Sequence, residues 1–431
     1  MNAALFTDDF KSAPYWWDLV PRPEFAEAAP PARADVLVIG SGYTGLHAAL
    51  QTSRAGRHTV VLDAEAAGFG CSTRNGGQIS TSIKPSYEEL ARRHGERRAF
   101  EIVKEGESSL RFIGEFIAEN RIDCDFTVVG RFHAAHNARQ YEFLAEQVKN
   151  QPKGLETAAH MVPRSEQRRE IGSDIYFGGA VFERHASVDP ARYHAGLLDR
   201  VIAAGADVVA YCAALSIEPS NGRFIVTTTR GKIDARDVVV ATNGYTGSAT
   251  PWLKRRVIPI GSYMIATEPL EPAIVDQLIP RNRIVSDTRK VIYYYRASPD
   301  RRRILFGGRV SLNETDPLLS GPKLHADMIG IFPQLAATKV SHSWCGFIAY
   351  SFDELMHIGQ HDGVYYAMGY CGGGVGTASY FGMRLGQKVL GLTEGRTALD
   401  DLRFQTRPLY TGNPWFLAPS ILYYRWRDRR A

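Results

Sequence analysis

The chain has 431 residues, of which 44% are hydrophobic and 23% charged, so it is long enough for two or three domains' worth of core. Its formal net charge of +5 is small for this length, and no nucleic-acid-binding motif accompanies its short basic clusters, which argues against nucleic acid as a partner. The five cysteines are scattered, and neither a secretory leader nor a run of about 18 apolar residues occurs, so we predict reduced thiols, no metal site and no stable membrane span, as in a cytoplasmic protein.

The first 33 residues have the composition of an arm rather than of a domain. They contain three consecutive aromatic residues, Tyr15-Trp16-Trp17, and then a stretch from Pro21 to Pro31 that is rich in proline and alanine. We predict that residues 1–33 are an N-terminal arm, held on the surface by its aromatic side chains, with a linker into the first strand.

The segment from residue 35 to residue 63 carries the strongest motif in the chain. An apolar run, Val36–Ile39, ends at Gly40, and apolar residues then recur at helical spacing, which predicts a strand, a tight turn and a helix. Gly40, Gly42 and Gly45 have the GxGxxG spacing. In that arrangement the first glycine takes the turn, the second lets a pyrophosphate approach the backbone, and the third lets the helix pack closely on its strand.

An acidic residue stands where a nucleotide-binding motif requires one. A second apolar run, Thr59–Leu62, ends at Asp63, which lies 18 residues after Gly45. This is close to the roughly 20 residues expected for a carboxylate that accepts hydrogen bonds from ribose hydroxyls. The unit therefore predicts dinucleotide binding, and the acidic residue favours FAD or NAD over NADP. A glycine-rich turn without a ligand is the less favoured alternative.

Residues 68–78 form a loop, because they contain too many glycines for the interior of a helix or a strand. Such a loop can bring backbone N–H groups and the Arg74 guanidinium against an anionic or electron-rich ring system. A plain surface loop is the alternative, and the residues alone leave both interpretations open.

The middle of the chain alternates between two kinds of pattern. From Ser86 to about Asn150 it is mainly helical and charged, which indicates a second domain inserted into the nucleotide-binding fold. After a predicted helix over residues 191–203, short strands with glycine turns span residues 208–233, and a buried strand covers residues 238–242. A βαβ unit, a β-meander and a return strand are the plan of two-dinucleotide-binding flavoproteins; an unrelated α/β sheet is the alternative.

Long aromatic strands are predicted between residues 251 and 343, over 258–267, 291–296 and 304–309. Side chains alternate along a strand, so Tyr293 and Tyr295 share one side. We predict that this sheet forms one wall of a substrate pocket. Plain packing of a half-buried sheet is an equally good interpretation of any single tyrosine.

A second strand, glycine loop and helix occur near the C-terminus. The predicted strand over 364–368 leads into a glycine-rich loop up to Gly376 and then a helix over about 377–392. The N-terminus of such a helix can meet a developing negative charge, for example on the N1–O2 side of a reduced flavin. Residues 401–431 are an aromatic and basic tail that can wrap the domain or rest on a partner.

Together these motifs resemble the FAD-dependent D-amino acid oxidase / glycine oxidase superfamily, and within it the γ-glutamylputrescine oxidase-like branch. The resemblance rests on the order and spacing of several segments: Val38–Gly45, Thr73–Gln78, Ala241–Thr246, Phe306–Arg309, Trp344–Gly359, Gly369–Val375 and Pro414–Leu417. It implies an α/β (α+β) chain with a Rossmann-like three-layer FAD-binding domain containing a β-meander (34–85, 185–250 and 345–400). A substrate domain on a mostly antiparallel mixed sheet (86–184 and 251–344) covers the flavin.

The resemblance also implies the residues that contact each ligand. For FAD they are Gly40, Gly42, Tyr43, Thr44, Gly45, Asp63, Arg74, Asn75, Gly76, Gly77, Gln78, Leu215 (through its backbone), Thr242, Asn243, Gly244, Gly372, Gly373, Gly374 and Val375. For the substrate pocket the candidates are Tyr263, Tyr293, Tyr295, Arg309 and Trp344. A structural salt bridge is the alternative role of Arg309.

The implied chemistry is hydride transfer from the carbon next to an unprotonated amine to flavin N5, followed by hydrolysis of the imine. The expected partners are a small-molecule amine or amino acid, with γ-glutamylated amines included, and O2, which would give hydrogen peroxide. No catalytic base is assigned, and neither the oligomeric state nor the particular amine follows from the sequence. A dehydrogenase that serves a quinone or a carrier, and a non-catalytic flavin-bound or nucleic-acid-modifying protein, are the alternatives.

Some positions depart from the pattern of the resembled family. Leu305 stands where sarcosine oxidase-like members have an oxygen-activating lysine, and Gly346 where they have the cysteine that holds the flavin covalently. The chain also has Gly373 and Met356 where many relatives have histidine and proline. We therefore predict non-covalent FAD, and Leu305 motivates the dehydrogenase alternative.

Overall fold

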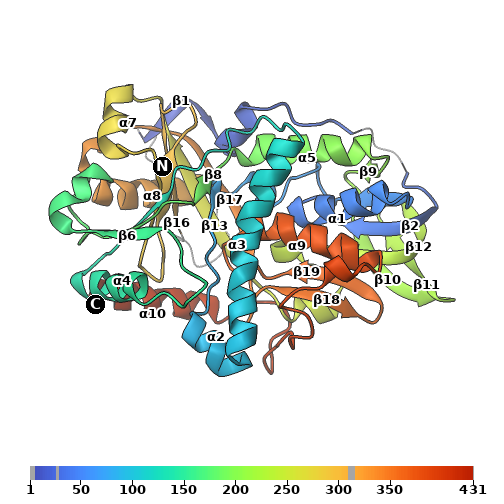
Figure 1. The fold of residues 1–431 in the computed structure, drawn as a ribbon. Coiled ribbons are helices and arrows are strands. Elements are labelled where there is room, and N and C mark those ends of the chain that lie inside the picture. Colours follow the sequence, from blue (N-terminus) through green and yellow to red (C-terminus); the bar gives the residue numbers. More distant parts are fainter. Residues whose placement is uncertain (1–4, 26–28, 309–315, 431) are drawn as a thin grey trace.

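The computed structural model describes residues 5–25, 29–308 and 316–430. In this part of the chain two large β-sheets lie side by side, and the long helix α3 (Glu96–Glu119) runs across their junction (Figure 1). No helix among the described residues is long and apolar enough to cross a membrane.

The first sheet contains eight strands in the described residues and has a parallel core. β2 (Arg33–Ile39) lies between β3 (Thr59–Leu62) and β12 (Gly231–Val240), and each of these pairs with it in parallel. Side chains of β2 alternate between two apolar clusters, with Val36 and Val38 on one face and Leu37 and Ile39 on the other. A strand that buries both faces has to be apolar throughout, which is why this run is continuous.

The remaining strands complete this sheet on its two sides. β9 (Asp207–Val209) pairs with β3, and β19 (Val364–Met368) pairs with β12, both in parallel. Antiparallel pairs add the meander β10 (Ala214–Ser220) and β11 (Arg223–Thr228), and the strand β18 (His357–His361). The two strands predicted within residues 232–242 are one strand, β12, because its charged residues alternate with buried Ile233 and Ala235 and leave the ladder unbroken.

Three helices of this half pack around α1 (Tyr43–Arg54): α5 (Pro190–Ala203), α9 (Gly374–Val389) and the long α3. α1 and α9 lie very close, since a Cβ added to Gly382 of α9 would lie 2.5 Å from the Thr44 carbonyl oxygen. Glycines at such crossings allow two helix backbones to approach, and this sets the position of both helix N-termini.

The second sheet has nine strands in the described residues and is mostly antiparallel, as predicted for a substrate domain. In spatial order they are β1 (Phe6–Lys11), β17 (Val340–Tyr350), β13 (Ile258–Thr267), β16 (Ile304–Gly308), β15 (Tyr294–Ala297), β14 (Ile284–Asp287), β5 (Arg131–Ala134), β7 (Gly179–Phe182) and β6 (Ala159–Val162). Only the pairs β1–β17 and β14–β5 are parallel within these residues. Strand β17 crosses the predicted domain boundary at residues 344 and 345, so one strand joins both halves.

The remaining helices and a short strand pair lie outside both sheets. They are α2 (Tyr87–His94), α4 (Ala138–Lys149), α6 (Pro251–Lys254), α7 (Pro272–Leu278), α8 (Pro317–Ile331), α10 (Leu417–Arg430) and the short pair β4 (Gln78–Ile79) and β8 (Ala186–Ser187). The tail returns to the substrate half, because the Asp428 carboxylate accepts hydrogen bonds from the N–H groups of Lys290 and Val291.

Candidate active site

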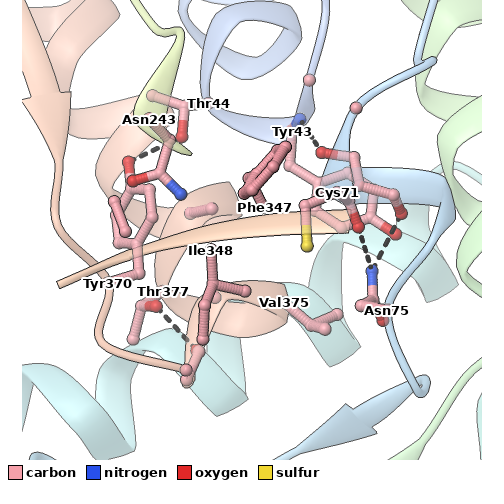
Figure 2. Close-up of a pocket in the computed structure, with 18 of the residues that line it drawn as sticks. Tyr43, Thr44, Cys71, Asn75, Asn243, Phe347, Ile348, Tyr370, Val375 and Thr377 are labelled. Atoms are coloured by element: carbon pink, nitrogen blue, oxygen red, sulfur yellow. Dashed lines mark hydrogen bonds between the residues drawn. The ribbon is translucent and has the colours of Figure 1, made fainter. Parts of the chain in front are cut away.

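A cavity of about 900 Å³ lies between the two sheets, at the upper end of the size range of ligand pockets. Its lining begins at the turn after β2, passes the loop over residues 69–78 and the glycines before α9, and ends on the β5–β14 face of the second sheet. Figure 2 shows one part of it, where Tyr43 and Thr44 of α1 face Val375 and Thr377 of α9. Among the described residues no group of three or more His, Cys, Asp or Glu side chains is arranged to hold a metal ion.

The turn after β2 fits the diphosphate of a dinucleotide. Gly40 has φ +106°, a conformation that favours glycine, and α1 begins after Gly42 without a side-chain cap. Gly40, Gly42, Tyr43 and Thr44 line the cavity. Gly45 does not line it, because its place is the contact between helix and strand: a Cβ there would lie 1.9 Å from the Gly40 carbonyl oxygen.

Asp63 lines the cavity at the end of β3, where a ribose-binding carboxylate is expected. Its Oδ2 accepts hydrogen bonds from the Ser41 N–H (2.9 Å) and hydroxyl (2.5 Å), and its Oδ1 accepts one from the Glu65 N–H (3.0 Å). A carboxylate has about four acceptor positions, so capacity remains for ribose hydroxyls. Burial raises the pKa of Asp63, and the hydrogen bonds from Ser41 oppose that shift.

The predicted adenine contact lies one residue away from the cavity wall. Leu215 is 52% exposed and does not line the cavity, whereas its neighbours Ala213 and Ala214 do. Backbone atoms of this segment therefore remain the candidate contact, carried by Ala213 and Ala214 rather than by Leu215.

The loop over residues 71–78 forms a firm wall. Asn75 Nδ2 donates to the carbonyl oxygens of Cys71 (3.1 Å) and Ser72 (2.9 Å), and Asn75 Oδ1 accepts from the Gly77 N–H (2.8 Å). Gln78 Nε2 donates to the Tyr295 carbonyl (3.1 Å), which fixes the loop to the second sheet. Asn75, Gly76 and Gln78 line the cavity, while Gly77 packs against Val188, whose carbonyl oxygen would lie 2.1 Å from an added Cβ.

Arg74 does not face the cavity, contrary to the sequence prediction. Its guanidinium lies over the rings of Trp17 and Phe69, Nε donates to the Phe69 carbonyl (2.6 Å) and Nη1 donates to the Cys345 carbonyl (3.1 Å). The side chain therefore stabilises the loop on the side that faces away from the cavity. It supplies no direct contact with a ligand in the cavity.

Two further glycine-rich loops reach the cavity. Thr242 and Asn243 line it, and Asn243 Oδ1 accepts from the Gly369 N–H (3.0 Å), while Gly244 packs against β17. The residues that precede or begin α9 also line it, namely Gly372, Gly373, Gly374 and Val375. α9 starts without a side-chain cap, and its first turn lines this part of the cavity, so its N-terminal N–H groups can meet a ligand there.

The aromatic residues predicted to line the substrate pocket lie elsewhere. Tyr263, Tyr295 and Trp344 are at most 1% exposed and lie outside the lining, as does Tyr293. Tyr295 stacks on Phe306 in the core, and Trp344 Nε1 donates to the Arg74 carbonyl (2.8 Å). Arg309 lies outside the described residues.

Tyr294 lines the cavity, as the sequence predicted for its neighbours Tyr293 and Tyr295. Strand β15 starts at Tyr294, and its register turns Tyr295 to the core and Tyr294 to the cavity, where its hydroxyl lies 2.5 Å from Ser262 Oγ. The alternation was predicted correctly but the face was wrong, because pairing with β14 and β16 sets it.

Sequence reasoning missed the far end of the cavity. Arg131 and His133 on β5 line it together with Ser286 on β14, and His133 Nδ1 lies 2.9 Å from Ser286 Oγ. Burial, with a smaller effect from Arg131, lowers the pKa of His133 to about 3, so its imidazole is neutral near pH 7. The available signal was two polar residues at alternate positions of an otherwise apolar strand.

Comparison with known proteins agrees with a dinucleotide site in this cavity. A family model described as "DAO: FAD dependent oxidoreductase" matches residues 35–388. The chain is 32% identical to the gamma-glutamylputrescine oxidoreductase of Escherichia coli over 405 residues, 92% of this chain and 93% of that protein. It is 30% identical to the probable oxidoreductase OrdL of Haemophilus influenzae over 376 residues, 86% of each chain.

Solved structures show the same fold at lower identity. Glycine oxidase from Geobacillus kaustophilus superposes with a TM-score of 0.74 at 17% identity, covering 88% of this chain and 99% of that one. L-proline dehydrogenase from P. horikoshii does so with a TM-score of 0.70 at 17% identity, covering 90% and 99%. The predicted fold class, a Rossmann-like FAD domain with a substrate domain, is confirmed.

Proposed function

The chain belongs to the DAO family of FAD-dependent oxidoreductases and is such an enzyme, and from that premise we propose that it oxidises the C–N bond of an amine or amino acid. The observation that carries this proposal is the continuity of one cavity from Asp63 and the GxGxxG turn to the polar face of the second sheet. A dinucleotide at one end and a small substrate at the other would share one enclosed space, as hydride transfer requires.

The residues fit FAD in three places. The turn at Gly40 and the N-terminus of α1 would hold the diphosphate, and Asp63 the adenosine ribose. The firm loop over residues 71–78 and the N-terminus of α9 would hold the ring system. By the family resemblance, Gly346 stands where sarcosine oxidase-like proteins have the cysteine that holds the flavin, and this supports non-covalent binding.

Bound FAD supplies an acceptor for the hydrogen and electron pair removed from the carbon that carries the nitrogen, and water then hydrolyses the resulting imine. The chain's own residues orient the substrate and limit access of water. Tyr294 lies against the ring-binding loop, since a Cβ added to Gly76 would lie 3.2 Å from its ring. Because no residue is assigned as the base, the amine would bind in the unprotonated form that hydride transfer requires.

The proposed substrate class comes from the relatives. A protein 32% identical is named gamma-glutamylputrescine oxidoreductase, and a structural neighbour is a glycine oxidase. We place a γ-glutamylated amine first and a small amino acid second. All five cysteines lie in the described residues and none of them forms a disulfide, in keeping with the cytoplasmic location that we propose.

The proposed electron acceptor is O2, with hydrogen peroxide as the product. Leu305 favours a second candidate, a dehydrogenase that passes electrons to a quinone or carrier. This residue is fully buried among Met264 and Trp344, so it offers no cation where oxygen-activating relatives have a lysine.

Parallel assays of one holoenzyme preparation distinguish the two acceptors. During turnover of γ-glutamylputrescine in air, an oxidase forms one hydrogen peroxide for each amine consumed. A dehydrogenase forms little peroxide but reduces a redox dye when oxygen is absent. Stoichiometric peroxide is the expected result. Dye reduction without peroxide would show that a carrier, rather than O2, is the electron acceptor.

A further inference from the structure

The part of the cavity lined by β5 and β14 carries a positive charge that has no counter-ion among the described residues. Arg131 lies on the cavity face of β5, and its register pairs it with Ile284 of β14 and with Phe182 of β7. The guanidinium lies 4.8 Å from the Phe182 ring centroid. Its Nε is buried, has no hydrogen-bond partner, and the group forms no ion pair with any described residue.

The neighbouring titratable groups do not neutralise this charge. Arg131 acts on both His133 and His185, and burial, the larger effect, lowers the pKa of each, to about 3 and about 2, so both are uncharged near pH 7. Lys84 lines the opposite wall, with Nζ 5.2 Å from the Tyr350 ring centroid, and adds positive charge. The only described carboxylate on this part of the lining, Glu354, is exposed to solvent.

A half-buried guanidinium without a counter-ion is costly, because removal of a charge from water is repaid only by an opposite charge or by hydrogen bonds. Burial alone lowers the pKa of Arg131, to about 10, and leaves it charged near pH 7. A carboxylate suits the planar fork of an arginine, which can bind both oxygens. A ligand that enters this end of the cavity can supply the missing negative charge.

The strand order indicates how far this charge lies from the reacting end. Tyr294, which borders the ring-binding loop, pairs with Ser286 of β14, whose partner on β5 is His133, and Arg131 lies two residues before His133. Two strand spacings combined with two residues along the strand amount to about 12 Å. An extended chain covers that span in roughly ten bonds, whereas an α-amino acid places its carboxylate two bonds from the nitrogen.

We propose that Arg131 binds a substrate carboxylate that lies about nine or ten bonds from the oxidised carbon, and so selects amines with a remote acidic group. A diamine acylated on one nitrogen by the γ-carboxyl of glutamate has this length and charge. This inference rests on the proposed function, because it assigns the substrate class of the same cavity.

The test compares two substrates in matched variants of the FAD-loaded enzyme. The substrates are γ-glutamylputrescine and its analogue in which the remote carboxylate is a carboxamide. The variants are Arg131→Met, Arg131→Lys, Lys84→Met and, as a control for loss of one exposed positive charge, Arg97→Met, whose side chain is 94% exposed. Flavin absorbance confirms that each variant folds and is loaded.

The wild type should prefer the carboxylate substrate, and Arg131→Met should lower that preference in kcat/KM by about 10- to 100-fold, mainly through KM. Arg131→Lys should recover part of it, and Arg97→Met should retain it. Equal losses for both substrates in Arg131→Met would show a structural role and overturn the inference. Loss of the preference in Lys84→Met instead would also overturn it.

A binding measurement keeps the inference separate from the proposed function. Glutarate is titrated calorimetrically into the wild-type and Arg131→Met holoenzymes, which needs no turnover. Binding that is lost in Arg131→Met supports the anion site even if every amine fails as a substrate, in which case only the proposed function falls. Binding of equal strength to both proteins would refute the anion site.

Discussion

At the scale of single residues, Asp63 shows how a binding site retains an unfavourable group. Its carboxylate is half-buried, and this desolvation raises its pKa despite three hydrogen bonds from Ser41 and Glu65. Ribose hydroxyls would donate to the charged form and offset part of that cost. The residue is therefore better suited to the complex with FAD than to the empty protein.

Asp63→Asn should weaken FAD binding by about 10- to 100-fold, because hydrogen bonds to a charged acceptor are replaced by weaker ones. Titration of the apoprotein with FAD, followed by quenching of flavin fluorescence, measures the change. Asp207→Asn on the neighbouring strand is the control, since its side chain is 50% exposed and pairs with His58. An unchanged dissociation constant for FAD in Asp63→Asn would show that Asp63 does not bind FAD.

The pH dependence of FAD affinity tests the same carboxylate. The pKa of Asp63 is raised in the empty protein, and hydroxyl donors favour the ionised form, so FAD binding should lower it and release a proton. The affinity of the wild type should therefore be greatest above that raised pKa and should decline as the pH falls through it. Asp63→Asn should lack this component, and an identical decline in both proteins would assign it to other groups.

At the scale of elements, the position of α1 depends on Gly45. A Cβ at this residue would lie 1.9 Å from the Gly40 carbonyl oxygen and 3.1 Å from Val38 Cγ1, so helix and strand would have to separate. Gly45→Ala should lower the free energy of unfolding of the apoprotein by about 1–3 kcal/mol and impair FAD uptake. Urea denaturation and FAD titration measure the two effects.

The matched control is Gly330→Ala in α8. This glycine is exposed, and an added Cβ would have no atom within 4 Å, so the change should raise the free energy of unfolding by roughly 0.5–1 kcal/mol. If Gly45→Ala behaved like this control, the close contact of α1 with β2 would not position the diphosphate site.

The elements also show what could be predicted from the sequence. The βαβ unit was predicted because its signals are local: an apolar run, three glycines at fixed spacing and an acid. The faces of Tyr293 and Tyr295 were not, because partner strands far away in the sequence set them. Arg131 was missed for the same reason, since only the parallel pairing of β5 with β14 brings residues 131 and 284 together. Arg74 was assigned to the ligand because no sequence signal distinguishes a loop's inner side from its outer side.

At the scale of the whole molecule, the N-terminal arm connects the edge of the second sheet to the ring-binding loop. β1 pairs with β17, and the arm continues to Trp16, which is fully buried and donates from Nε1 to the Asn75 carbonyl (2.8 Å). Trp17 Nε1 donates to Thr73 Oγ1 (2.9 Å) in the same loop. The arm therefore supports a wall of the site although it lies far away in the sequence.

Trp16→Phe should lower the free energy of unfolding by about 1–3 kcal/mol, because the Asn75 carbonyl loses a donor, and should also weaken FAD binding. Denaturant unfolding with and without FAD measures both. Trp415→Phe is the control, since this tryptophan is 68% exposed. Loss of stability without any change in FAD affinity would limit the arm to a structural role.

The central claim is that one cavity joins a flavin to an amine. Rapid mixing of the purified yellow holoenzyme with γ-glutamylputrescine under anaerobic conditions tests it directly, since the colour of the oxidised flavin is the readout. We predict that the colour bleaches within the mixing experiment and returns when an acceptor is admitted. A protein that takes up no FAD, or that stays yellow with γ-glutamylated amines and amino acids alike, would contradict the claim.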